Sequence, residues 1–351
     1  MTADPRPAAL LLEVTDLVTH FRSPRGLVRA VDGVTLSIER GQAVGIVGES
    51  GAGKTVLARS IMGLISDADA ERRGSVRFRG DELLHRRDRQ MRSIWGRSMA
   101  MVFQDPMGSL NPLMRVGDQV SEPLRVHLGM GRGEARAAAE RLLTDVRIPQ
   151  PARRMRQFPH ELSGGTRQRV MIAIALACGP ELLFADEPTT SLDVTVQAQI
   201  LALLDEQRRT RNMAMVLVTH DLGVVANHTD VTLVMYGGSI VERAPTRTLF
   251  SNMKMPYTEA LFESIPSLEA APHSRRSAIP GRPPDLVAPP PGCRFAPRCA
   301  YARDRCHAEQ PPLVAAEAPD HQYACWYPLR PPDHRTGTAS RPDPAAARET
   351  R

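Results

Sequence analysis

The chain has 351 residues, 42% of them hydrophobic and only 4% aromatic, which suits one large α/β domain with a tail and a core of aliphatic side chains. The formal net charge is +6, and arginine carries nearly all the positive charge because Lys54 and Lys254 are the only lysines. No apolar run approaches the roughly 20 residues that a membrane span needs. Residues 1–8 are polar and proline-rich, so we expect no secretory signal. Any path across a membrane would have to be formed by other chains.

The predicted elements alternate along the chain. Alternating apolar positions between glycines and prolines predict short strands over residues 11–38. A buried strand follows at 42–47, then a glycine-rich loop, then a helix at 56–64. Residues 106–160 are predicted to be mostly helical, most clearly at 134–146. The other predicted strands lie at 99–103, 182–185, 213–218 and 231–235, and the other helices at 166–177 and 194–208. This alternation predicts an α/β fold, a mostly parallel sheet wrapped by helices.

The composition changes after about residue 267, where prolines cluster between Ile279 and Gly292. We interpret this stretch as a linker or an irregular packed segment that leads to a cysteine-rich region. The last residues are polar and rich in Pro, Ala and Arg, which predicts a disordered tail. The expected division of the chain is 11–262, 263–330 and 331–351.

The segment GESGAGKT matches the phosphate-binding pattern G-x-x-x-x-G-K-[ST] and lies between a predicted strand and a predicted helix. Its glycines let backbone N–H groups approach a polyphosphate, Lys54 neutralises the β- and γ-phosphates, and Thr55 offers a hydroxyl to Mg²⁺. We therefore predict ATP binding by the whole segment: Gly48, Glu49, Ser50, Gly51, Ala52, Gly53, Lys54 and Thr55.

The segment LLFADEP, residues 182–188, describes a buried strand whose tip carries two acids. Near a phosphate loop, Asp186 is expected to hold Mg²⁺, and Glu187 is expected to orient and polarise the attacking water. An apolar strand that ends in acids is common, so this prediction depends on the phosphate loop.

The segment LSGGTRQR, residues 162–169, resembles the signature of the ABC ATPase family. A serine and small residues at a helix N-terminus can form an anion site that a second chain uses. The resemblance implies that Ser163 and Gly165 contact the γ-phosphate of ATP held by the opposite subunit. Thr166 stands where the family usually has glutamine. The expected signature residues are Ser163, Gly164, Gly165 and Thr166.

Three further segments match this family in order and spacing. Gln104 resembles the Q-loop glutamine, which senses Mg²⁺ and contacts membrane subunits. Ser191-Leu192-Asp193 resembles the D-loop, which communicates across the dimer, and we assign Asp193 to it. His220 resembles the switch histidine that hydrogen-bonds the γ-phosphate and joins Glu187 and Gln104 in catalysis. Phe21 is equally suited to stack on adenine or to be a core residue.

Longer matches narrow the resemblance to ATPases of dipeptide and oligopeptide importers. They run from about Leu11 to Pro328 and include DPMGSLNP, DEPTTSLDVTVQAQI, VMYGGSIVE, PYTEAL and GCRFAPRC. The resemblance implies an ABC-type P-loop ATPase with an antiparallel β-subdomain, a helical subdomain and a small Cys-rich C-terminal extension. Importers of nickel and other small solutes share much of the pattern and stay an alternative.

The resemblance also implies partners. We expect a second, similar ATPase subunit in a heterodimer, two transmembrane permease subunits, an extracytoplasmic solute-binding protein and no nucleic acid. The chain is then a peripheral protein at the cytoplasmic face of the membrane. A DNA-repair ABC ATPase is disfavoured, because such proteins carry long insertions between phosphate loop and signature, whereas Gly48 and Leu162 are close here.

The chain has five cysteines, of which Cys178 ends an apolar helix and is expected in the core. The other four cluster near the C-terminus, where thiols without a secretory context indicate metal before disulfides: Cys293, Cys299, Cys306 and Cys325. Their spacing is wider than in most paired zinc sites, and four thiolates also match one 4Fe-4S cluster. The resemblance implies such a cluster, so we predict 4Fe-4S, with zinc or no metal as alternatives.

Overall fold

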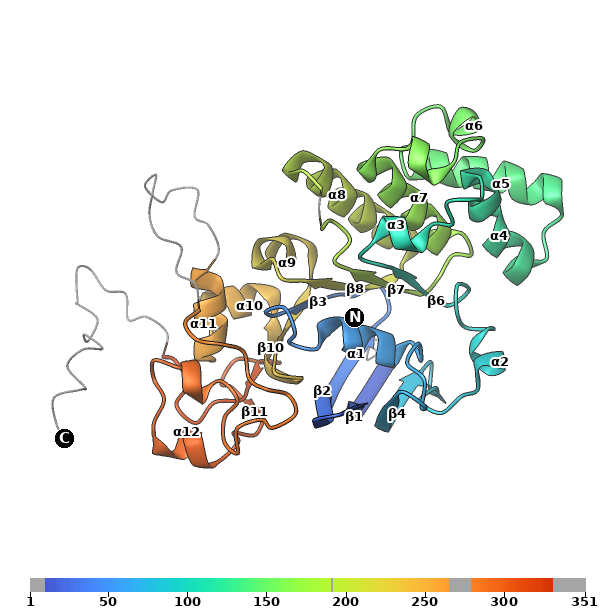
Figure 1. Ribbon diagram of the computed structural model, residues 1–351. Helices are drawn as coiled ribbons and strands as arrows, with labels where there is room; N and C mark the ends of the chain where they lie inside the picture. The colour runs from blue at the N-terminus through green and yellow to red at the C-terminus, as the bar shows by residue number, and fades with distance from the viewer. Residues whose placement is uncertain (1–9, 191, 265–278, 331–351) are drawn as a thin grey trace, which may run out of the picture.

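The computed structural model describes residues 10–190, 192–264 and 279–330. These residues form two sheets, one of four strands and one of eight, with helices packed around them (Figure 1). Within these ranges, none of the helices is both long enough and apolar enough to cross a bilayer. The predicted tail, 331–351, lies outside the described residues.

The smaller sheet is antiparallel, with strand order β2-β1-β4-β5. Its first two strands pair along a long hairpin and lie where strands were predicted over residues 11–38, although each has 14 residues and is longer than expected. Bulges along this pair let the two strands stay joined where the alternation in the sequence breaks. The bounds are β1 Leu10–Ser23, β2 Gly26–Glu39, β4 Ala70–Phe78 and β5 Asp81–Glu82.

The larger sheet has the order β11-β12-β10-β9-β3-β8-β7-β6, and its central strands are parallel. Every residue of β3, β7 and β8 is buried, as expected for strands covered by helices on both faces. The mostly parallel α/β sheet is confirmed. The bounds are β3 Ala43–Val47, β6 Met99–Val102, β7 Leu182–Asp186, β8 Ala214–Thr219, β9 Val231–Tyr236, β10 Ser239–Pro245, β11 Val314–Ala315 and β12 Gln322–Tyr323.

The expected helical arm is present and projects to one side of the larger sheet (Figure 1). It consists of α3 Pro106–Ser109, α4 Val116–Leu128, α5 Arg132–Asp145, α6 Pro151–Arg154 and the 3-10 turn Pro159–Glu161. The other helices are α1 Lys54–Ile61, α2 Asp88–Met91, α7 Gly164–Leu176, α8 Val194–Arg211, α9 Leu222–His228, α10 Thr246–Ser251, α11 Pro256–Glu263, the 3-10 turn Ala296–Arg298 and α12 Asp304–Ala308.

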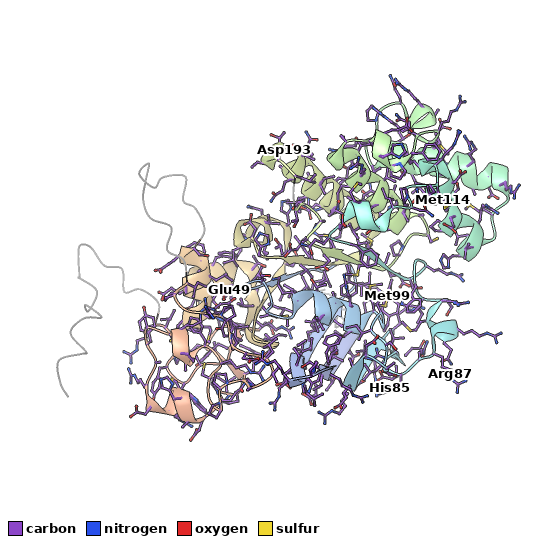
Figure 2. All side chains as sticks on the ribbon, in the orientation of Figure 1. Glu49, His85, Arg87, Met99, Met114 and Asp193 are labelled. Carbon is purple, nitrogen blue, oxygen red and sulfur yellow. The ribbon has the colours of Figure 1, made fainter. Side chains whose placement is uncertain are left out.

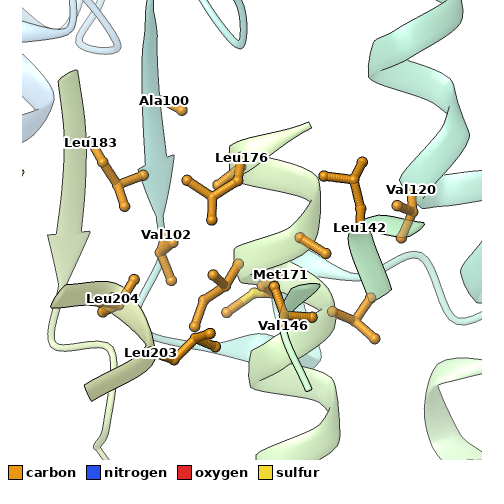
Figure 3. Close-up of a cluster of buried hydrophobic side chains, with 14 of the residues drawn as sticks. Ala100, Val102, Val120, Leu142, Val146, Met171, Leu176, Leu183, Leu203 and Leu204 are labelled. Atoms are coloured by element: carbon orange, nitrogen blue, oxygen red, sulfur yellow. The ribbon is translucent and has the colours of Figure 1, made fainter. Parts of the chain in front are cut away.

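A buried apolar cluster joins the helical arm to the larger sheet (Figure 3). Met171 and Leu176 on α7 face Val102 on β6 and Leu183 on β7, and all four side chains are buried. Each fully buried side chain of this size contributes roughly 1.5–3 kcal/mol. This packing holds α7, which begins at the signature segment, against β6 and against β7, the strand that ends at Asp186.

Candidate functional site

The loop of residues 48–53 leaves β3 and leads into α1 with backbone conformations that require glycine. Gly48 has φ 155° and Gly53 has φ 100°. A Cβ atom on Gly53 would lie 2.2 Å from the carbonyl oxygen of Ala30, and one on Gly48 would lie 2.3 Å from that of Met235. Only glycine fits both positions, so neighbouring strands hold the loop tightly in a phosphate-binding shape.

Lys54 lies at the start of α1 with only 5% of its surface exposed. Its Nζ atom donates to the carbonyl oxygens of Gly48, at 2.8 Å, and Glu49, at 3.0 Å. Burial lowers the pKa of Lys54, whereas the nearby carboxylates of Glu187, Asp186 and Glu49 raise it. In this structure the ammonium group of Lys54 is therefore bonded to the same loop that would wrap a polyphosphate.

Asp186, at the end of β7, is fully buried. Thr55 donates its hydroxyl to Asp186 Oδ1 at 3.0 Å, while Oδ2 has no hydrogen-bond partner within the described part of the chain. Burial raises the pKa of this carboxyl. A carboxylate oxygen left unpaired beside a hydroxyl suits a hard divalent cation, because such ions take oxygen ligands. Thr55 and Asp186 therefore fit Mg²⁺.

Three side chains converge on the carboxylate of Glu187. Gln104 Nε2 and Thr190 Oγ1 both bond to Oε2, at 3.0 and 2.9 Å. His220 Nδ1 lies 3.3 Å from Oε1. The sequence had placed Gln104 also on Mg²⁺, but in this structure its amide contacts Glu187. Thr190 was missed, although its position three residues after the acid in DEPTT is a local signal that could have been used.

Residues of the phosphate loop, with Gln104, Glu187 and His220, line one open cleft of about 700 Å³. Phe21 forms part of its wall and is opposite Val28 in the β1–β2 pair, so its ring lies at the cleft and not in the core. Leu286, from the proline-rich stretch, also lines the cleft. The full lining is Phe21, Val28, Ala30, Ser50, Gly51, Ala52, Gly53, Lys54, Thr55, Val56, Gln104, Glu187, His220 and Leu286.

The signature and D-loop residues form a separate surface at the N-termini of α7 and α8. Ser163 caps α7 by accepting from the Thr166 N–H, and Asp193 caps α8 by accepting from the Val196 N–H. A Cβ atom on Gly165 would lie 2.8 Å from Val196 Cγ1, so the two helices meet closely here.

The signature and D-loop residues are absent from the described lining of the cleft, and Figure 2 shows Asp193 well away from Glu49. Ser191, which the sequence assigned to the D-loop, lies outside the described residues.

Glu49, in the phosphate loop, is held by two residues that the sequence did not indicate. Arg298 donates to both carboxylate oxygens of Glu49, at 2.6 and 2.9 Å. The backbone N–H of Glu49 donates to Tyr257 Oη at 2.8 Å. Arg298 is far away in the sequence and belongs to a segment with no regular pattern, so no local signal could have found this contact.

The prediction of a 4Fe-4S cluster was wrong, and the zinc alternative has no support. Cys293, Cys299, Cys306 and Cys325 do line one small cavity, but its other walls are mainly apolar and aromatic. Burial raises the pKa of Cys299 to about 11 and of Cys325 to about 12. The described ranges contain no group of three or more His, Cys, Asp or Glu residues arranged to hold a metal ion.

Two family models match the chain. Residues 31–190 match the ABC transporter model, and residues 241–306 match the model of the oligopeptide/dipeptide transporter C-terminal region. Among solved structures, the dimeric ATP-binding cassette MJ0796 bound to ADP and Pi superposes with a TM-score of 0.61 at 27% identity, covering 67% of this chain and 99% of that one. The cassette fold is therefore shown.

Curated relatives extend the match over nearly the whole chain. The oligopeptide transport ATP-binding protein OppD of Salmonella typhimurium is 46% identical over 93% of this chain and 97% of its own length. The dipeptide transport ATP-binding protein DppD of Escherichia coli is 46% identical over 91% of this chain and 97% of its own. This chain spans 51% of OppD of Mycobacterium tuberculosis, at 49% identity. The chain therefore belongs to the family of ATP-binding subunits of oligopeptide and dipeptide ABC transporters, and it is an ABC-type ATPase.

Proposed function

We propose that this chain binds ATP in the cleft above the phosphate loop and that hydrolysis at Glu187 powers the import of dipeptides or oligopeptides. The observation that carries the catalytic part is the convergence of Gln104, Thr190 and His220 on one carboxylate at the cleft. The relatives' printed functions in oligopeptide and dipeptide transport support the solute class.

The loop supplies the positive charge for the phosphates. Lys54 would exchange its two bonds with loop carbonyls for the β- and γ-phosphates of ATP, while backbone N–H groups of the loop and of the start of α1 point at the same anion. Phe21 would lie against the base, since its ring is at the cleft wall.

Glu187 is proposed to orient the attacking water and to accept its proton. Gln104 and Thr190 bond to its Oε2 atom, so we assign the water to Oε1, beside His220. His220 is proposed to bond the γ-phosphate as the cleft closes. Thr55 and Asp186 would hold Mg²⁺, and Gln104 would join them once its amide leaves Glu187. The ion would neutralise charge on the phosphates.

The separate surface formed by Ser163, Gly165 and Asp193 supports a composite site. Its exposed N-termini suit an anion, yet the described lining of this chain's cleft does not include them. We propose that Ser163, Gly164, Gly165 and Thr166 face ATP bound by a second, similar ATPase subunit. The dimeric cassette among the structural neighbours agrees with this arrangement.

The remaining partners are two permease subunits and an extracytoplasmic solute-binding protein, with this chain at the cytoplasmic face of the membrane. A largely apolar groove of about 330 Å³ supports a permease contact, because its wall contains Phe103, the residue before Gln104. A helix of the permease in this groove would contact the segment of Phe103 and Gln104, and the amide of Gln104 bonds to Glu187.

The proposed division keeps residues 11–262 as the ATPase domain and residues 263–330 as a small Cys-rich C-terminal extension. The match of residues 241–306 to the C-terminal region model supports this boundary only in part, because the match starts within β10. Pairing of β12 with β10 supports an extension docked on the ATPase sheet.

Substitution of Glu187 by glutamine tests the catalytic assignment. Glutamine keeps the size of the side chain but cannot take a proton, so the ATPase rate of the assembled transporter should fall by at least about 100-fold while ATP binding persists. The matched control is Glu206→Gln, an exposed residue of α8, which should keep the normal rate. A normal rate in Glu187→Gln would remove Glu187 from catalysis.

A further inference from the structure

Residues 285–287 of the C-terminal extension dock on the edge of the smaller sheet. The backbone N–H of Arg29 donates to the carbonyl oxygen of Leu286 at 3.0 Å. Asp285 forms an ion pair with Arg25 in the β1–β2 turn. Because β2 is an edge strand, this segment covers backbone groups that the sheet leaves free. The proline-rich stretch is therefore packed and is not a free linker.

This docking places Leu286 in the wall of the nucleotide cleft, which Val28 and Phe21 also line. None of these three side chains carries a hydrogen-bonding group, in contrast to Lys54 and Thr55 at the phosphate loop. Leu286 is only half-buried, so part of its apolar surface is open to the cleft. The three side chains together form an apolar wall.

The position of this wall along β2 indicates which part of ATP it meets. Ala30 lies against Gly53 of the phosphate loop, and Val28 is two residues earlier on the same face of β2. Two residues of strand span roughly 6.6 Å. The apolar wall therefore begins about two residues of strand away from the phosphate loop, on the side where the rest of the nucleotide must lie.

We propose that Leu286 is a base-binding residue, so that the C-terminal extension supplies part of the nucleotide site. Leu286 and Phe21 would bury the faces of a purine ring between them. An apolar contact does not distinguish the exocyclic groups of adenine and guanine, so this contact should contribute equally to the affinity for both bases. This inference rests on the proposed function, in which the cleft binds ATP.

The test measures binding of ATP, GTP and inorganic tripolyphosphate to the full chain by calorimetry. Leu286→Ala should weaken ATP and GTP about five- to tenfold, because it removes apolar contact with the base, and should leave tripolyphosphate unchanged. Leu286→Met should bind all three like the native chain. Val287→Ala is the control from the same segment, since Val287 packs near Gly26 outside the cleft lining, and it should also bind normally.

Lys54→Ala separates this inference from the proposed function, because it should weaken all three ligands. If Leu286→Ala binds ATP normally while Lys54→Ala does not, the base contact is refuted and the nucleotide site stands. If Leu286→Ala loses tripolyphosphate as well, its effect is on the whole fold and the inference is equally overturned. If Lys54→Ala binds ATP normally, the proposed function fails.

Discussion

At the scale of single residues, Asp186 combines full burial with an unpaired oxygen. Burial raises its pKa, which means that folding favours the protonated carboxyl. The ionised form, present as the pH rises through this raised pKa, then costs stability in the protein without Mg²⁺. A bound Mg²⁺ would offset the cost of burying the ionised carboxylate of Asp186.

Asp186→Asn should therefore stabilise the nucleotide-free protein at pH 8 by about 1 kcal/mol, because the buried charge is removed while Thr55 keeps an acceptor. The gain should shrink as the pH falls through the raised pKa of Asp186, where the native carboxyl is also neutral. Urea unfolding at several pH values measures this. A gain that stays constant or grows toward low pH would contradict the sign.

Where the signal is local in sequence, the predicted residues lie near one another in the structure. The phosphate loop and Glu187 each follow a buried strand directly, and they line one cleft. Thr190 and Arg298 were missed because their roles depend on geometry between segments. The cysteines show the opposite error. Their spacing correctly indicated four thiols near one another, but it did not reveal that the other walls of their cavity are mainly apolar and aromatic.

At the scale of elements, the 3-10 turn Ala296–Arg298 and helix α11 together hold the phosphate loop. Arg298 bonds Glu49, and Tyr257 on α11 accepts from its backbone. The side chain of Arg298 is only 3% exposed, so this ion pair is shielded from solvent. The loop is thus fixed by its own glycines and by the C-terminal extension.

Arg298→Gln should weaken ATP binding by about tenfold and lower the free energy of unfolding by roughly 2–3 kcal/mol, because it leaves Glu49 without its charged partner. Arg305→Gln is the matched control for binding: this half-exposed arginine of α12 pairs with Glu309 and stacks on Trp326, so the change should leave the ATP affinity native. Native ATP affinity in Arg298→Gln would show that the loop needs no such support.

Elements were predictable where the sequence has a continuous apolar run, as in β3, β7 and β8, or helical apolar spacing, as in α5. Strand β4 carries several arginines and a glycine, so it shows little alternation, and it becomes a strand because β1 offers a partner along its length. Pairing of the two-residue strand β12 with β10 likewise depends on tertiary contact alone. Short elements of this kind have no signal in the sequence.

At the scale of the whole molecule, the proposed composite site divides its contacts between two separate surfaces of the chain, the cleft and the signature surface. Ser163→Arg places a bulky cation on the signature surface only. ATP binding by the isolated chain should remain native, because the described cleft lining excludes Ser163. In the assembled dimer, hydrolysis should fall at the site whose phosphate loop belongs to the other subunit.

Site-specific trapping of nucleotide in the dimer distinguishes the two clefts. Loss of ATP binding by isolated Ser163→Arg protein would contradict the composite arrangement, and so would a loss of hydrolysis confined to this chain's own cleft. Lys54→Ala is the complementary control, because it should weaken ATP binding in this chain's own cleft.

The central claim is tested most directly by peptide uptake. The assembled transporter is placed in liposomes, ATP is supplied on the side of this chain, and the uptake of a radiolabelled peptide is measured. The native complex should accumulate peptide in proportion to ATP hydrolysed. The Glu187→Gln complex should bind ATP yet accumulate almost none. Peptide accumulation at the native rate by the Glu187→Gln complex, or ATP hydrolysis by the native complex without any peptide uptake, would contradict the account.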